Sequence, residues 1–142
     1  MIFHKDPKVK LLKDVAIFHG CSSDELQFIA KQAADMTYED GDVLLRAGSA
    51  GHEFLVLADG KAEILVGGEH LADASPGAHF GEISLLEQSR RTATVVARGP
   101  VRVLAWDDAA FERILAEVPR VRATVHKTAY ERMANVEPEQ PE

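Results

Sequence analysis

Apolar residues recur at helical spacing near the start of the chain. Between residues 8 and 35 they lie three or four positions apart, which predicts amphipathic helices. Ser22, followed three residues later by Glu25, matches a capping box and predicts the start of one of these helices. The apolar positions on the predicted helix faces are Val9, Leu12, Ala16, Leu26, Ile29, Ala30 and Ala33.

Residues 36 to 106 have a different pattern, in which short runs of β-branched and aromatic residues alternate with turn signals. The turns follow one another about every 8 to 12 residues and are EDGD, AGSAG, ADGK, VGGE, SPGA and ARGP. Gly67 and Gly68 form a two-residue hairpin turn, because both glycines can adopt a positive φ angle. The pattern therefore predicts a compact antiparallel β-structure, a roll or a barrel.

Helical spacing returns after Asp107, and Pro119 suits the first turn of a second helix there. The predicted apolar stripe of the first helix is Phe111, Ile114, Leu115 and Val118. The face shared on the second helix is Val121, Val125, Thr128 and Arg132. The acidic, proline-rich residues 136–142 are expected to be disordered. The predicted fold class is α+β, an antiparallel, jelly-roll-like β-roll with N-terminal helices and two C-terminal helices, in one domain over residues 1–135.

Composition limits the possible functions. At 142 residues, the chain is long enough to bury a core without disulfides or a metal. Its formal net charge of -7 argues against binding of nucleic acid by this chain alone, because contacts to phosphates need a basic surface. The single cysteine, Cys21, cannot form an internal disulfide, which favours a cytoplasmic location. The chain has no apolar run of the roughly 20 residues that a membrane span needs, and its histidines lack the spacing of metal ligands.

The segment FGEISLLEQSRRTATV, residues 80 to 95, contains residues that a structural loop does not need. Its EISLLEQ part predicts a short helix whose N-terminal amides attract an anion, and Gly81 lets a ligand approach the backbone closely. Arg91 would add a positive charge with a planar fork that suits phosphate oxygens, and Thr92 would add a hydroxyl. Glu82 repels phosphate, so its presence predicts a ligand that also offers a hydroxyl donor, such as the ribose of a cyclic nucleotide.

This segment resembles the phosphate-binding cassette of cyclic nucleotide-binding domains, whose pattern is F-G-E-[LIM]-[AS]-L followed by R-[AST]-A-[TS]-V. The chain has FGEISL from Phe80 and RTATV from Arg91. The resemblance extends to the helical lead-in VAIFHGCSSDELQFIA and to YEDGDVLLRAGSAGHEFLVLADGKAEI, which resembles the early strands of the family. It covers residues 9 to 133 and implies a β-roll that binds cAMP or cGMP, without any other cofactor.

The resemblance implies a role for each matching residue. The amides of residues 81–84 would hold the phosphate and the sugar. Glu82 would accept a hydrogen bond from the ribose 2′-OH, and Arg91 would pair with the cyclic phosphate. Thr92 would contact the phosphate and, in cGMP, the base. The predicted ligand contacts are Phe80, Gly81, Glu82, Ile83, Ser84, Arg91, Thr92, Ala93, Ile64 and Arg132.

The last helix contains HKTAYER, which resembles the terminal helix of this domain in bacterial cyclic-nucleotide-gated potassium channels, where an arginine contacts the base. Arg132 is the matching arginine, and Tyr130 is a second candidate. The resemblance implies that this helix closes as a lid when ligand binds, whereas the alternative is that Arg132 only extends to solvent. Two positions depart from the cassette pattern, because Arg90 stands where proline is common and Ser84 where alanine is commoner.

Three classes of function compete. The first is a sensor that binds cAMP in preference to cGMP. The second is a degenerate domain used only for protein interaction, which would be expected to lack Glu82 or Arg91. The third is an enzyme that processes cyclic nucleotides, which needs a metal cluster or an acid–base pair that the sequence does not display. We therefore expect a non-enzymatic sensor. The residues after Pro119 are too few for the winged helix-turn-helix of catabolite-activator-type regulators, so we expect the sensor to act through a protein effector or to belong to a larger parent protein.

Overall fold

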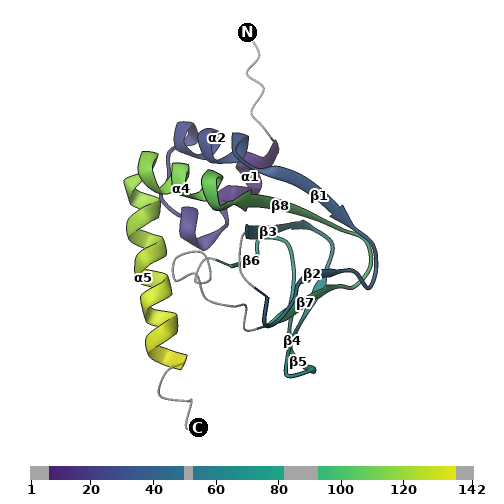
Figure 1. Cartoon of the computed structure of the whole chain (residues 1–142). Coiled ribbons are helices and arrows are strands. Elements are labelled where there is room, and N and C mark those ends of the chain that lie inside the picture. Colours follow the sequence, from purple (N-terminus) through teal and green to yellow (C-terminus); the bar gives the residue numbers. More distant parts are fainter. Residues whose placement is uncertain (1–6, 50–52, 82–92, 137–142) are drawn as a thin grey trace.

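Helices lie at the two ends of the chain and strands lie between them (Figure 1). The computed structural model describes residues 7–49, 53–81 and 93–136, with side chains described from Lys8 to Lys127 within these ranges. The N-terminal helical elements are α1 (Pro7–Lys13), the 3-10 helix η1 (Ala16–Phe18) and α2 (Ser23–Lys31). The strands are β1 (Ala34–Tyr38), β2 (Val43–Leu45), β3 (Glu53–Asp59), β4 (Ala62–Val66), β5 (Glu69–Ala74), β6 (His79–Phe80), β7 (Thr94–Ala97) and β8 (Val101–Asp107). The C-terminal helices are α4 (Asp108–Glu117) and α5 (Pro119–Val136).

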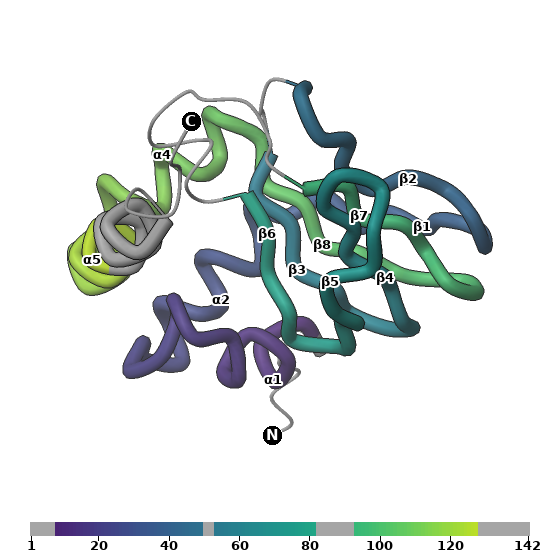
Figure 2. Tube along the Cα trace, turned by 90° about the horizontal axis from the view of Figure 1, so that it is seen from below, coloured from purple at the N-terminus to yellow at the C-terminus, as the bar shows by residue number. Residues whose placement is uncertain are grey.

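In the described part of the chain, the strands form two four-stranded sheets in which every pairing is antiparallel. One sheet has the order β1-β8-β3-β6, and the other has the order β2-β7-β4-β5. The helices gather beside the first sheet, and the second sheet lies on its opposite side (Figures 1 and 2). This arrangement confirms the predicted α+β class and the antiparallel β-roll flanked by helices.

Strands β3 and β8 are buried on both faces, because side chains alternate between two cores. The helix-side core contains Phe54 and Trp106 together with apolar residues of the helices. The inner core of the roll contains Leu55 and Ala105 together with residues of the second sheet. The first sheet is therefore the middle layer of the molecule, which explains the continuous apolar runs in its two central strands.

The N-terminal helical region agrees with the sequence pattern, with two corrections. The predicted capping box is confirmed, since the Ser22 Oγ accepts from the Glu25 N–H at 3.1 Å and the Glu25 Oε1 accepts from the Ser22 N–H at 2.8 Å. Ala16, however, is exposed in η1 and does not share the buried face of α1. The helical region also ends before residue 35, because Ala34 pairs with Ala105 of β8 and begins β1.

The C-terminal helices begin where the sequence predicts. The Asp107 side chain accepts from the Ala110 N–H at 2.8 Å and caps α4, and Pro119 opens α5. The predicted stripe of α4 is buried, apart from the half-buried Leu115, and Val121 and Val125 of α5 are fully buried against the same helix-side core. The hairpin turn is confirmed as well, with φ angles of 61° and 82° at its two glycines. None of the helices in the described part of the chain has the length and hydropathy of a membrane span.

Candidate functional site

The two ends of the predicted cassette lie on different sheets. The cassette starts with Phe80, the last residue of β6, and with Gly81, which follows it. Strand β6 is an edge strand of the first sheet. The far end of the cassette, Ala93, directly precedes β7, an inner strand of the second sheet. Residues 82–92, which include Glu82, Ile83, Ser84, Arg91 and Thr92 and the predicted short helix, lie outside the described residues. The cassette segment therefore connects the two sheets of the roll.

Gly81 has a backbone conformation that other residues rarely adopt. Its φ angle is +105°, in the region where a side chain on an L-residue is strained. Phe80, the preceding residue, pairs with Leu55 of β3, and its partly buried side chain packs against the inner core. A substitution of the glycine would therefore strain the chain at the entry to the cassette.

Ile64 and Phe80 are brought to the same core from different sheets. Ile64 lies on β4 opposite Val95 of β7, and its half-buried side chain packs against the inner core that also contacts Phe80. Val95 is two residues after Ala93, and the Oγ of the intervening Thr94 accepts from the Ala47 N–H at 3.0 Å. Half-buried apolar side chains thus lie near both described ends of the cassette.

Arg132, the predicted lid residue, lies on α5 beyond the residues whose side chains are described. The backbone of this helix starts within the helical cluster, and its C-terminal half extends away from that cluster (Figure 1). Val121 and Val125 fix the first half of the helix. The contact between Arg132 and the base stays a prediction.

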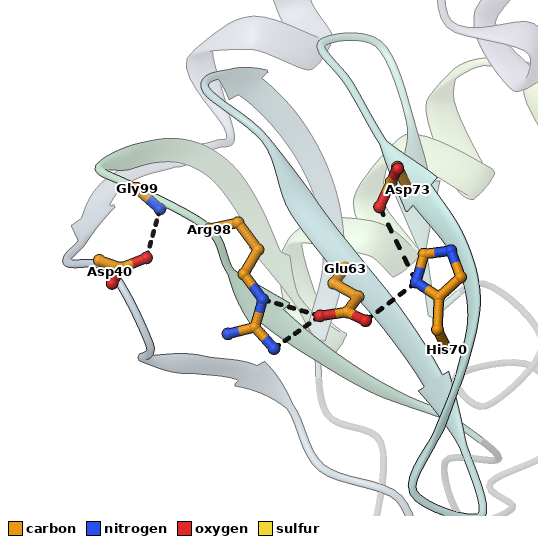
Figure 3. A network of polar contacts seen from close by, with 6 residues as sticks. All are labelled: Asp40, Glu63, His70, Asp73, Arg98 and Gly99. Atoms are coloured by element: carbon orange, nitrogen blue, oxygen red, sulfur yellow. Dashed lines mark hydrogen bonds and ion pairs between the residues drawn. The ribbon is translucent and has the colours of Figure 1, made fainter.

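A polar network that the sequence reasoning missed holds the outer face of the second sheet (Figure 3). The Arg98 Nε donates to the Glu63 Oε1 at 2.7 Å, and the His70 Nδ1 lies 2.9 Å from the Glu63 Oε2 and 3.9 Å from the Asp73 Oδ1. The hydrogen bond from His70, and then that from Arg98, lowers the pKa of the Glu63 carboxyl. Because Glu63 precedes Ile64 on β4, the network holds the outer face of the strand that carries a predicted ligand contact on its inner face.

The hairpin register could have revealed part of this network. The turn at Gly67 and Gly68 makes β4 and β5 antiparallel neighbours, which brings residue 63 near residue 70. Arg98 carries no such signal, since it is 35 residues away from Glu63 along the chain. Its position depends on the pairing between β4 and β7.

The described residues offer little nucleophilic or metal chemistry. Burial, and next the nearby Glu25 carboxylate, raises the pKa of the Cys21 thiol, so that the reactive thiolate is disfavoured at neutral pH. Among the side chains described between Lys8 and Lys127, no cluster of three His, Cys, Asp or Glu residues could hold a metal ion. What this part of the chain shows at the start of the cassette is Gly81 with a positive φ angle, directly after Phe80, which packs against the inner core.

Comparison with known proteins identifies the family. The family model described as "Cyclic nucleotide-binding domain" matches residues 35–118, which is more than half of the chain. The chain therefore belongs to the cyclic nucleotide-binding domain family. The matched region runs from β1 to the end of α4 and so includes both sheets of the roll.

Individual relatives agree with this assignment. A cAMP-dependent protein kinase regulatory subunit from Hypocrea atroviridis is 32% identical over 126 residues, which cover 86% of this chain and 27% of the relative. The Catabolite Activator Protein of Thermus thermophilus is similar in structure, with a TM-score of 0.77 and 26% identity over 87% of this chain and 60% of that chain. The regulatory domain of Toxoplasma gondii PKA, crystallised with cAMP, has a TM-score of 0.73 and 26% identity over 87% of this chain and 48% of that chain. The chain spans about a quarter of the length of the kinase regulatory subunits that it matches.

Proposed function

We propose that this chain is a regulatory domain that binds a cyclic mononucleotide, prefers cAMP to cGMP, and acts on a protein effector or on a larger parent protein in the cytoplasm. The observation that carries the proposal is the cassette sequence, which begins at a positive-φ glycine beside the apolar core and joins the two sheets. Membership of the cyclic nucleotide-binding domain family supports it. The preference for cAMP has the support of relatives named as cAMP-dependent kinase subunits and of a related domain crystallised with cAMP.

The phosphate and the ribose of the ligand would each have a partner in the proposed cassette. The backbone amides of residues 81–84 would surround the phosphate and sugar, and Arg91 would neutralise the cyclic phosphate. Glu82 would accept from the ribose 2′-OH, which makes the site selective for ribonucleotides. Thr92 would donate to the phosphate and could also meet the amino group of guanine, so we expect cGMP to bind as well.

The apolar part of the ligand would lie against the inner core of the roll. Ile64 and Phe80 lie at the margin of that core and would pack against the purine, together with the half-buried Ala93 just before β7. Arg132 on α5 would stack on the base or meet its edge, so that ligand binding favours a docked position of the helix. This movement would pass the binding event to an effector or to a parent protein.

A thermal-shift titration with cAMP, cGMP and 5′-AMP tests the proposal. A ligand that binds only the folded state stabilises it by about 2.7 kcal/mol when its concentration is 100 times Kd. We expect cAMP and cGMP to raise the Tm and 5′-AMP to have little effect, with less than about 3 kcal/mol between the two cyclic nucleotides in competition titrations. If neither cyclic nucleotide changes the Tm, the chain is a degenerate interaction domain, although the presence of Glu82 and Arg91 disfavours that function.

A further inference from the structure

Strand β6 is anchored in two cores at once. Its two residues pair with β3 so that His79 lies opposite Val56, and Phe80 lies opposite Leu55. Because side chains alternate along a strand, Phe80 packs against the inner core, whereas His79 faces the helix-side core that contains Val56. This two-residue strand directly precedes Gly81, where the proposed cassette begins.

The ring of His79 contacts the aromatic residues of the helix-side core. Its centroid lies 5.7 Å from that of Phe54, at an interplanar angle of 43°, and its Nδ1 is buried. The Phe54 ring in turn contacts Phe18 of η1 at 6.1 Å, Trp106 of β8 at 5.6 Å and Phe111 of α4 at 5.2 Å. His79 therefore connects β6 to a fully packed aromatic cluster, defined here as Phe18, Phe54, Trp106 and Phe111.

The segment before β6 is fastened by its backbone. The Gly77 N–H donates to the Leu57 carbonyl at 2.8 Å, and the Leu57 N–H donates to the Ala78 carbonyl at 2.9 Å. Strand β6 itself is short and is an edge strand, with a neighbour on one side only. Backbone hydrogen bonds therefore hold it less firmly than an inner strand. The position of Gly81 therefore depends largely on the side-chain contacts that Phe80 and His79 make on the two faces of β6.

We propose that His79 is a positioning residue for nucleotide binding, because its contact with Phe54 holds β6 and Gly81 in place before the ligand arrives. The inference rests on the proposed function and adds a residue to it that contacts no ligand. A segment that is ordered before binding loses less conformational entropy when the ligand binds, and the affinity is correspondingly higher. A residue that only fills space in the core would stabilise the free and bound states equally and would leave the affinity unchanged.

The test compares the affinity for cAMP, measured by isothermal titration, with the free energy of unfolding for the same variants. We expect His79→Ala to bind about tenfold more weakly, because an aromatic contact of this kind is worth up to about one order of magnitude. His79→Phe keeps a ring against Phe54 and should bind within about threefold of the parent chain. The matched control is His19→Ala, which removes an exposed histidine directly after η1 and should leave the affinity unchanged.

A second comparison separates positioning from folding. In a Phe54→Leu background the ring partner is absent, so H79A should no longer weaken binding beyond the effect of F54L alone. If H79A fails to fold, His79→Leu replaces it, since leucine fills space without a ring, and it should bind more weakly than His79→Phe. Equal affinities for the parent and for the ring-free variants, with or without a loss of stability, would overturn the positioning role alone. A parent chain that binds neither cAMP nor cGMP would overturn the proposed function and this inference together.

Discussion

The two cores on either side of β3 and β8 differ in the size of their side chains. The helix-side core contains the aromatic cluster and a hydrogen bond from the Trp106 Nε1 to the Ile29 carbonyl at 2.9 Å. The inner core consists mainly of alanine, valine and leucine, with Ile64 and Phe80 half-buried at its margin. On one side the large rings pack the helices against the sheet, whereas on the other side the smaller side chains border the proposed site. The difference fits a helix side that provides rigidity and an inner side that borders the proposed site.

Removal of a ring from the helix-side core should give the largest effect. Phe111 is 2% exposed and contacts Phe54, so we expect Phe111→Ala to lower the free energy of unfolding by about 3–5 kcal/mol. Denaturant titration measures this change. Leu71→Ala, at a residue that is 64% exposed on β5, is the control and should change the stability by less than about 0.5 kcal/mol. A loss below about 1 kcal/mol in the Phe111 variant would contradict the structural role of this core.

Removal of the cassette arginine should affect binding and leave both cores intact. We expect Arg91→Ala to weaken cAMP binding by about 2–5 kcal/mol, because the cyclic phosphate would lose its cation in a partly desolvated site. Isothermal titration checks the affinity, and Arg90→Ala provides a control at the adjacent position. Glu82→Ala should weaken the binding of cAMP more than the binding of 2′-deoxy-cAMP, which lacks the hydroxyl. An Arg91→Ala variant that binds like the parent would show that the cassette assignment is wrong.

Helix α5 begins in the helix-side core and carries the one predicted ligand contact outside the roll. We expect Arg132→Ala to weaken cAMP binding by about 0.5–2 kcal/mol, the range of a cation–π contact, without loss of the phosphate contacts. Hydrogen exchange should also show residues 121–133 gaining protection with cAMP. Tyr130→Phe tests the second candidate. Identical exchange of this helix with and without ligand would exclude the lid, even if the pocket binds normally.

The smallest expected effect concerns pH and the outer face of the second sheet. Hydrogen bonds from His70 and Arg98 lower the pKa of Glu63 in the folded chain. A lowered pKa means that the unfolded chain binds the proton more readily, so this stabilisation is present at neutral pH and is lost as the pH falls through the folded pKa. Glu63→Gln should therefore reduce the loss of stability on acidification, measured by denaturant titrations between about pH 7 and about pH 3. Added salt should shrink the difference, because His70 and Arg98, the partners of Glu63, are exposed.

The sequence predicted those helix starts and turns that depend on residues close together in the chain. The capping box at Ser22, the proline at the start of α5 and the double glycine between β4 and β5 each fix the backbone through neighbouring residues. The start of β1 could not be predicted in the same way. Ala34 and Asp35 are weak strand formers, and they are extended because they pair with Ala105 and Leu104 of β8.

For the site, the cassette motif identified Phe80 and Gly81, whose positions the structure describes, and by resemblance the charged residues between them and β7. The sequence did not reveal the role that we infer for His79, because that role depends on a ring contact with Phe54, which is 25 positions earlier in the chain. The spacing of the histidines in the sequence bears only on metal binding and carries no signal for a packing contact. The contact of Arg98 with Glu63 was missed for the same physical reason, since a long-range strand pairing creates it.

The strand order of the first sheet has a consequence for synthesis on the ribosome. Strand β8, the last of the described strands, inserts between β1 and β3, so these two earlier strands have no direct pairing with each other in this sheet. The sheet can therefore close only after residue 107 has emerged from the exit tunnel, and every shorter nascent chain leaves the facing edges of β1 and β3 unpaired. Pairing between strands so distant in sequence is slow, since a long loop must close first. The domain is thus built to fold after translation of its last strand, not progressively from its N-terminus.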